Sequence, residues 1–189
     1  MNRIFFDIET TGLPKNPGFG IFPHPSDIAK YDSSRLIELG MKHLDDDGNE
    51  LYTFQTLIKD RDVNVENTII HGITNEKKES IGMSMTDMIC QFISRINENT
   101  IILSYNASFD VNVLLSECYR CNFTEAILKI NSCKFECIMN LVRLKMKSNY
   151  NIKLSRFHSM ISNTITVQDH RAMSDVELAI DVYNHLCNI

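Results

Sequence analysis

The order of apolar patterns along the chain predicts an α/β fold. Three strand-like segments come first, at residues 2–13, 35–44 and 51–58, and the later part alternates helical spacing with a further short strand. Consecutive strands followed by alternating helices and strands are typical of a sheet covered by helices. The 189 residues suffice for one domain with a substantial core, so we expect a single domain over residues 1–189.

Composition is that of an ordinary globular protein, with 43% hydrophobic and 23% charged residues. The net charge of -5 argues against a broadly basic surface that coats nucleic acid, but it is compatible with an enzyme that grips only a chain end. No apolar run is long enough for a transmembrane helix, and the first ten residues lack a signal-peptide pattern. We therefore expect an intracellular, by default cytoplasmic, protein with no membrane partner.

The six cysteines are expected to be reduced thiols, because the chain shows no secretory signal. One interpretation of the cysteine spacing is a structural zinc site, formed by Cys118 and Cys121 together with Cys133 and Cys137. The favoured interpretation is core packing, since Cys118 falls on an apolar helical stripe.

The first strand carries two acids within an apolar run. Asp7 and Glu9 are two residues apart, so they project from the same strand face. Two carboxylates in an apolar setting are costly unless a positive group compensates them, and no Lys or Arg stands between them. A pair of hard divalent cations such as Mg²⁺ would do so. The alternative is a strand whose acids face water.

Residues 14–34 contain all four prolines and are expected to form a loop without strand or helix. Long loops inside compact domains are often functional, and this one leaves the strand that carries the acids. Its apolar residues Phe19, Ile21 and Phe22 indicate either a flank of a substrate cleft or a surface that recruits a partner.

The next two strands form a hairpin over 35–44 and 51–58, because Asp47-Gly48 is a strong turn signal. With the first strand they predict an antiparallel meander. The acids at 45–47 lack the spacing and the closing Glu of a calcium loop, so a plain turn is favoured.

Beyond the hairpin, helical spacing begins at Met85 and runs to Ile96, with the methionines as core filler. Residues 100–105 read as a short buried strand that leads into a helix with Asp110 in its first turn. An acid there is favoured by the helix dipole. It could equally be a third metal-binding carboxylate at the carboxyl end of a strand, where open α/β sheets place their sites.

Two further helices are expected over 136–147 and 154–161, and a last one follows residue 174. Ser174 and Glu177 have the spacing of a capping box that starts this last helix. His170 precedes the helix and Asp175 lies in its first turn. Taken singly, each is more easily explained as structural than as functional.

Three motifs in one chain are more specific than any of them alone. They are FDIETTGL at 6–13, NASFD at 106–110 and HRAMSD at 170–175, with HGIT at 71–74 between them. In this order and spacing the chain resembles the DEDDh family of 3′-5′ exonucleases, which includes the epsilon proofreading subunit of bacterial replicative polymerases. The resemblance spans nearly the whole chain. It implies a ribonuclease H-like fold, a mixed five-stranded sheet flanked by helices on both faces.

The resemblance also implies roles for named residues. Four carboxylates would bind two Mg²⁺ ions, for which Mn²⁺ can substitute, and His170 would be the general base. The spacing from His170 to Asp175 selects the branch with His rather than Tyr at this position. A histidine suits the role because its ordinary pKa of about 6.5 lets it accept a proton near neutral pH. The implied metal ligands are Asp7, Glu9, Asp110 and Asp175.

The terminal nucleotide would be held by the remaining motif residues, again by resemblance. They are Thr10, Thr11, Leu13, His71, Asn106 and Phe109. His71 could instead be purely structural. The chain departs from many relatives at Tyr105, where they have His, and this puts nucleotide contacts at that position in doubt.

The expected activity is release of 5′-mononucleotides from the 3′ end of single-stranded or frayed DNA, as in proofreading or repair, with a polymerase as one candidate partner. Trimming of RNA ends is the alternative, because the contacts that distinguish the 2′-OH need not appear in a motif. A non-catalytic module that binds nucleic acid or a polymerase is a further alternative. All four acids are present, which disfavours that alternative.

Overall fold

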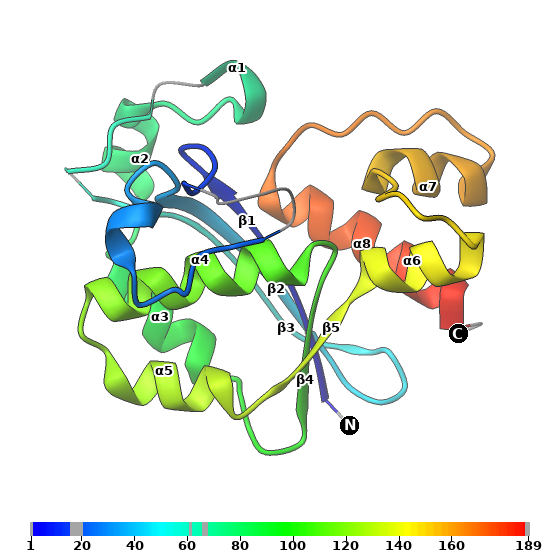
Figure 1. Cartoon of the computed structure of the whole chain (residues 1–189), viewed down its shortest axis with the longest axis horizontal. Helices are drawn as coiled ribbons and strands as arrows, with labels where there is room; N and C mark the ends of the chain where they lie inside the picture. Colours follow the sequence, from blue (N-terminus) through cyan, green and yellow to red (C-terminus); the bar gives the residue numbers. More distant parts are fainter. Residues whose placement is uncertain (1, 16–20, 61, 66–67, 188–189) are drawn as a thin grey trace.

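The computed structural model describes residues 2–15, 21–60, 62–65 and 68–187. Its centre is one five-stranded sheet in the order β3-β2-β1-β4-β5 (Figure 1). β1 pairs antiparallel with β2 and parallel with β4, so the sheet is mixed, and β5 adds a second parallel pair. The predicted meander is therefore confirmed, with β1 at its inner end. The strands are β1 Asn2–Thr10, β2 Leu36–Leu44, β3 Glu50–Leu57, β4 Thr100–Ser104 and β5 Lys134–Cys137.

Helices cover both faces of this sheet (Figure 1). None of the helices in the described segments is long and apolar enough to cross a membrane. The elements are η1 Ile28–Tyr31 (a 3₁₀ turn), α1 Thr68–His71, α2 Asn75–Ile81, α3 Met85–Ile93, α4 Ala107–Arg120, α5 Thr124–Asn131, α6 Ile138–Met146, α7 Leu154–Ser162 and α8 Ala172–Cys187.

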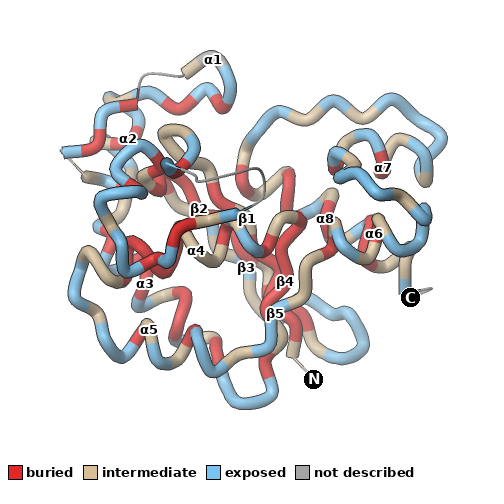
Figure 2. The backbone as a smooth tube through the Cα atoms, viewed as in Figure 1, coloured by how far each residue is buried: buried red, intermediate tan, exposed pale blue. Residues whose placement is uncertain are grey.

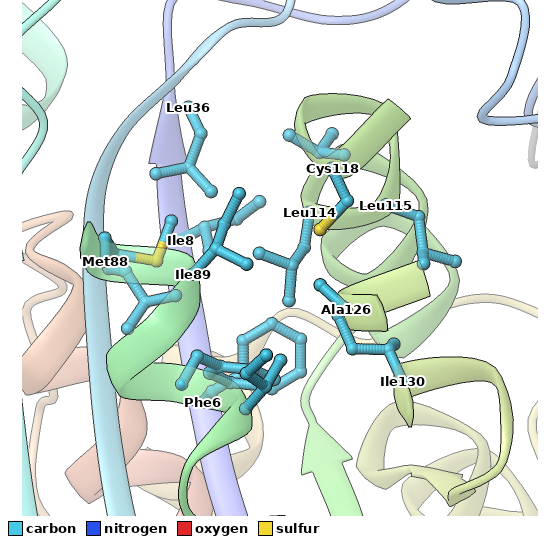
Figure 3. Close-up of a cluster of buried hydrophobic side chains, with 14 of the residues drawn as sticks. Phe6, Ile8, Leu36, Met88, Ile89, Leu114, Leu115, Cys118, Ala126 and Ile130 are labelled. Carbon is cyan, nitrogen blue, oxygen red and sulfur yellow. The ribbon is translucent and has the colours of Figure 1, made fainter. Parts of the chain in front are cut away.

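Two apolar layers hold the helices to the sheet, and the buried residues concentrate along the strands between them (Figure 2). On one face α3, α4 and α5 pack through residues such as Met88, Leu114 and Ile130 (Figure 3). On the other face α6, α7 and α8 pack around Phe5 and Val176. Both layers contact β1, which makes this strand the centre of the molecule.

Alternation along β1 decides which layer each side chain joins. Phe6 belongs to the α3–α5 layer, where its ring lies 5.4 Å from that of Phe92. Phe5 belongs to the α8 layer, where its ring lies 5.4 Å from that of Tyr183. Asp7 and Glu9 have the same parity as Phe5, so both acids face α8.

The structure corrects several element predictions. Residues 14–34 include the 3₁₀ turn η1, so that segment is not pure loop. The helix expected over 136–147 begins only at Ile138, because residues 134–137 pair with β4 as the edge strand β5. α2 and α5 were not predicted, since with 7 and 8 residues both are too short to show a clear helical period. Phe19, named above in the 14–34 segment, lies outside the described residues.

Candidate active site

A close approach between β2 and α8 creates the site. Gly40 pairs with Asp7 across the β1–β2 ladder. A Cβ atom added at Gly40 would lie 2.7 Å from the backbone of Ala172 and Met173. Glycine therefore lets the first turn of α8 descend onto the sheet beside the strand that carries both acids.

The descent of α8 brings three ligand-bearing side chains together. One ligand atom each from Glu9, His170 and Asp175 lies within 4.8 Å of the others. Glu9 comes from β1, while His170 precedes α8 and Asp175 lies in its first turn. The structure thus joins residues more than 160 positions apart in the sequence, which the spacing of single motifs could not establish.

Asp110 reaches the same region from the third motif. It lies in the first turn of α4, is 3% exposed and accepts a hydrogen bond from the Ser104 hydroxyl at the end of β4. Its proximity to β1 is evident from a hydrogen bond with the backbone of Ile8. Ser104 was missed in the sequence, where it looked like an ordinary strand residue.

The four carboxyl groups hold protons more tightly than ordinary acids. Burial, then repulsion by Asp110, Asp175 and Glu9, raises the pKa of Asp7 well above its usual range. Burial and the charge of Asp175 raise the pKa of Glu9 to about 8. Burial raises the pKa of Asp110 to about 7, against the hydrogen bond from Ser104. Burial also raises the pKa of Asp175. Such mutual repulsion is what a bound cation relieves.

The donor set fits a hard divalent cation. Asp175 is buried, and its Oδ2 accepts a hydrogen bond from Gln168 Nε2 at 2.5 Å. Its Oδ1 is buried without any partner, so one carboxylate oxygen is left for a ligand. With Asp7, Glu9 and Asp110 the groups are carboxylates, the ligands that Mg²⁺ and Mn²⁺ prefer.

The start of α8 is stabilised differently from the prediction. Ser174 is not an N-cap, because α8 already begins at Ala172. Asp169 accepts from the Arg171 N–H at 3.3 Å and from the Ser174 hydroxyl at 3.1 Å. Glu38 accepts from the Ala172 N–H at 3.1 Å. The predicted capping box was therefore wrong. Glu38, an acid on β2, instead accepts a hydrogen bond from a backbone N–H at the start of α8, as a capping side chain would.

His170 is held in an uncommon backbone conformation. Its φ is +52°, in the left-handed region that residues other than glycine rarely adopt. The residue after it is fixed by an ion pair, in which Arg171 donates to Glu38 from Nε at 3.0 Å and from a terminal nitrogen at 2.5 Å. These contacts explain how the exposed His170 is kept beside Glu9.

Glu38 supports the start of α8, a role that was not predicted from the sequence. It is fully buried, pairs with Glu9 in the β1–β2 ladder and also accepts a hydrogen bond from Gln55 at 2.9 Å. A signal was available, since Glu38 is an acid within an apolar strand, as are Asp7 and Glu9.

The predicted nucleotide-binding residues line the end of β1 and its surroundings. A bulge separates Glu9 from Thr10, whose hydroxyl donates to the Gly12 carbonyl at 2.8 Å. The Thr11 hydroxyl accepts from the Arg35 N–H at 3.0 Å, which ties the turn to β2. Leu13 follows with 75% of its surface exposed, so an apolar side chain is open to solvent just beyond the end of β1.

His71 lies near the site from another direction. It is buried, and its Nδ1 accepts a hydrogen bond from the Ile73 N–H at 3.1 Å. Its Nε2 is buried without a partner. Burial lowers the pKa of His71, and the nearby charges of Arg171 and His170 lower it further, against Glu38. A neutral imidazole with a free Nε2–H is thus available.

Asn106 and Phe109 frame the start of α4. Asn106 is its N-terminal flanking residue and makes no side-chain cap, so its amide is free for other contacts. The Phe109 ring lies 5.9 Å from the Phe22 ring, which brings the 14–34 loop over this corner. Ile21 is 59% exposed on the same loop.

Two remaining sequence questions have structural answers. The Tyr105 hydroxyl has a structural partner, because it donates to the Ile152 carbonyl at 2.6 Å. The cysteines do not gather into a metal-binding group within the described segments. Cys118 is buried in the core, while Cys133 and Cys137 donate to backbone carbonyls.

The decisive comparison is with protein-family models. The model described as Exonuclease (RNase T) matches residues 4–183, nearly the whole chain. The chain belongs to this exonuclease family. The match confirms the family predicted from the three motifs, and with it the enzyme class of an exonuclease. No curated protein sequence matches the chain significantly.

Solved structures agree with this family at the level of the fold. E. coli Exonuclease I in complex with a dT13 oligonucleotide has a TM-score of 0.74 at 19% identity, covering 98% of this chain and 40% of that one. The zinc ion bound form of the E. coli ExoI–ssDNA complex has a TM-score of 0.73 at 20% identity, covering 95% and 39%.

A moderately thermophilic Exonuclease I from Methylocaldum szegediense has a TM-score of 0.72 at 20% identity, covering 97% of this chain and 40% of that one. The present chain therefore spans about two fifths of the length of these Exonuclease I proteins. The likeness confirms the predicted ribonuclease H-like fold.

Proposed function

We propose that the protein is a metal-dependent 3′-5′ exonuclease that releases 5′-mononucleotides from single-stranded or frayed DNA. The observation that carries this proposal is the convergence of Glu9, His170 and Asp175 within 4.8 Å, beside Asp7 and Asp110. The E. coli relatives were solved with single-stranded oligonucleotides, which supports a DNA strand as substrate.

In this mechanism His170 accepts the proton of the water that attacks the terminal phosphodiester. The water forms a new P–O bond, the bond from phosphorus to the 3′ oxygen of the preceding nucleotide breaks, and a proton from solvent completes that hydroxyl. His170 is exposed and returns its proton to solvent. Its ligand atom lies within 4.8 Å of those of Glu9 and Asp175, which supports this role, because a general base has to lie within reach of the water that it deprotonates.

Asp7, Glu9, Asp110 and Asp175 would hold two Mg²⁺ or Mn²⁺ ions. When bound, such ions acidify the attacking water and offset charge on the leaving 3′ oxygen. The unpartnered Oδ1 of Asp175 and the raised pKa values of Asp7 and Glu9 support this assignment.

The terminal nucleotide would lie against the end of β1. Leu13 offers an exposed apolar surface for the base, and Thr10 and Thr11 shape the turn beneath it. Phe109 and Asn106 would bound the pocket at the start of α4, and the free Nε2–H of His71 would donate to the substrate. A polymerase or repair partner remains a prediction from the resemblance to proofreading subunits.

The test is a time course on 5′-labelled single-stranded DNA and RNA of one sequence, with Mg²⁺, Mn²⁺ or EDTA. We expect a ladder that shortens from the 3′ end with metal only, and faster for DNA. The variant His170→Ala should lower the rate by about 10²- to 10⁴-fold, the usual contribution of a general base. Faster shortening of RNA would assign the protein to RNA trimming. Binding of a 3′ end without any shortening would leave a non-catalytic module.

A further inference from the structure

Charge is distributed very unevenly along this acidic chain. Residues 137–168 contain five Lys and Arg and no Asp or Glu, while the rest of the chain holds 14 Lys and Arg against 24 Asp and Glu. This cationic stretch forms α6, α7 and the loop between them, beside α8 (Figure 1). A protein of net charge -5 thus presents one local basic surface.

Four of these cations are exposed and have no hydrogen-bond or ion-pair partner among the described residues. We call them the α6–α7 basic face; they are Lys145, Lys147, Lys153 and Arg156. Cations elsewhere are often paired, as Arg35 is with Glu117 and Arg120 with Asp32. The basic face therefore contributes no internal salt bridge to the fold.

Helix stability does not account for this face. Lys145, in the last turn of α6, is favourably placed relative to the helix dipole. Lys153 immediately precedes α7 and Arg156 lies in its first turn, where positive charge is unfavourable and where no acid or side-chain cap compensates. These exposed charges are therefore available to a negatively charged ligand outside the protein.

The face is built on a fixed loop and connects to the candidate site. Tyr105 donates to the Ile152 carbonyl at 2.6 Å, so the loop before α7 is anchored to the end of β4. After α7, the segment 163–171 returns to His170. Thr166 is held by His158 at 2.7 Å and Gln168 by Asp175 at 2.5 Å. The segment that follows α7 is therefore tied at one end to α7 and at the other to Asp175 of the candidate site.

This surface also carries groups on which bases can rest. Tyr150, in the loop between α6 and α7, is 81% exposed. Ile165 and Val167 are 92% and 84% exposed. Thr166 and Gln168, which alternate with them, instead hydrogen-bond to the protein. Cations interleaved with an exposed aromatic ring are what single-stranded nucleic acid requires, phosphates on the cations and bases on the ring.

We propose that the α6–α7 basic face binds the sugar–phosphate backbone of the single strand whose 3′ end occupies the candidate site. This inference rests on the proposed function and extends it to nucleotides upstream of the scissile bond. It explains how an acidic protein holds a polyanion, since the attraction is confined to one face.

The test compares two variants of equal charge. The patch variant changes Lys145, Lys147, Lys153 and Arg156 to Gln; the control changes Lys59, Lys77, Lys129 and Lys134 to Gln, which lie on other parts of the molecule. Affinity for labelled dT and rU strands of 4 and 12 nucleotides is measured in EDTA over a range of NaCl concentrations. The wild-type protein is also assayed for strand shortening with Mn²⁺.

We expect the patch variant to bind the 12-mers at least about 10-fold more weakly, and the slope of log Kd against log [NaCl] to fall by up to about 0.7 per lost cation. The control should bind as the wild type does, and the 4-mers should discriminate less. The inference would be overturned if the patch variant kept the affinity and the salt dependence of the wild type, or if the control variant lost as much affinity as the patch variant. It would also be overturned if the patch variant lost affinity for a blunt duplex to the same extent as for the single strands. If the wild type shortens no strand, the proposed function fails, and this assignment fails with it.

Discussion

At the residue scale, the carboxyl groups of the candidate site are partly or fully buried and repel one another, and both effects change their pKa values measurably. Their pKa values are raised in the folded protein, to about 8 for Glu9 and about 7 for Asp110. A raised pKa means that the folded protein binds these protons more tightly than the unfolded chain does. Metal-free protein is therefore stabilised at low pH, and this stabilisation is lost as pH rises toward about 8.

We expect the melting temperature in EDTA to fall between about pH 5 and pH 8.5, through this effect of the site. Millimolar Mn²⁺ should raise it, and more at pH 8.5 than at pH 5, because metal and protons compete for the same oxygens. In EDTA at pH 8.5, Asp110→Asn should melt several degrees higher than the wild type and lose its response to Mn²⁺. A wild-type melting temperature that is insensitive to Mn²⁺ at every pH would contradict the metal assignment.

The ion pair between Arg171 and the fully buried Glu38 is a second residue-scale feature. Removing one partner strands a buried charge, which costs about 3–5 kcal/mol, whereas removing both costs less. Arg171→Gln should thus be less stable than the double variant Glu38→Gln with Arg171→Gln in denaturant unfolding. Since the pair acts by holding His170, kcat should stay low in both. Full activity in the double variant would show that the pair supports stability alone.

His71 allows a more local test. Its Nε2 is unpartnered although the side chain is 3% exposed, so the fold does not use this donor. His71→Phe keeps a ring of similar shape but removes both that donor and the Nδ1 that accepts from the Ile73 N–H. We expect a higher KM for a DNA strand, together with a melting temperature lowered by the loss of the hydrogen bond from Ile73. Loss of stability with an unchanged KM would make His71 purely structural.

At the scale of elements, the approach of α8 to β2 is the critical contact. The backbone atoms at 2.7 Å from a Cβ at Gly40 cannot move aside as a flexible side chain could. Gly40→Ala should therefore displace the start of α8, costing about 1–3 kcal/mol. It should also lower kcat at least about 10-fold, because small misplacements of catalytic groups are costly.

The control is Gly48→Ala in the β2–β3 hairpin. There φ is +86° and nothing lies within 4 Å of an added Cβ, so the substitution strains only the turn. It should lower the melting temperature while kcat stays at the wild-type value. Equal kcat losses in the two variants would mean that general destabilisation, not α8, limits activity.

At the scale of the whole molecule, sequence reasoning was most successful where one signal repeats. The meander and α3 were predicted because apolar spacing persists over whole elements, and the family because three motifs recur in order. The four-residue edge strand β5 was missed, since its pairing with β4 is a property of the sheet and not of the local pattern.

The residues of the candidate site likewise fall into those that motifs predicted and those that the sequence did not reveal. Asp7, Glu9, Asp110, His170 and Asp175 were predicted from motifs, and the structure brings them to one region. Glu38 was missed and Ser174 misread as a cap, because both depend on how α8 meets β2. A contact between elements distant in the sequence has no local signature, and Gly40 shows this most clearly.

The position of α8 has a consequence for synthesis of the protein. β1 is made before α8, and the proposed base His170 and the proposed ligand Asp175 follow Glu9 by more than 160 residues. A chain that has left the ribosome only as far as β5 holds Asp7 and Glu9 but neither of these two groups. On the proposed function, the hydrolytic centre is therefore completed only when α8 docks, and a growing chain would not attack the nucleic acids that surround it.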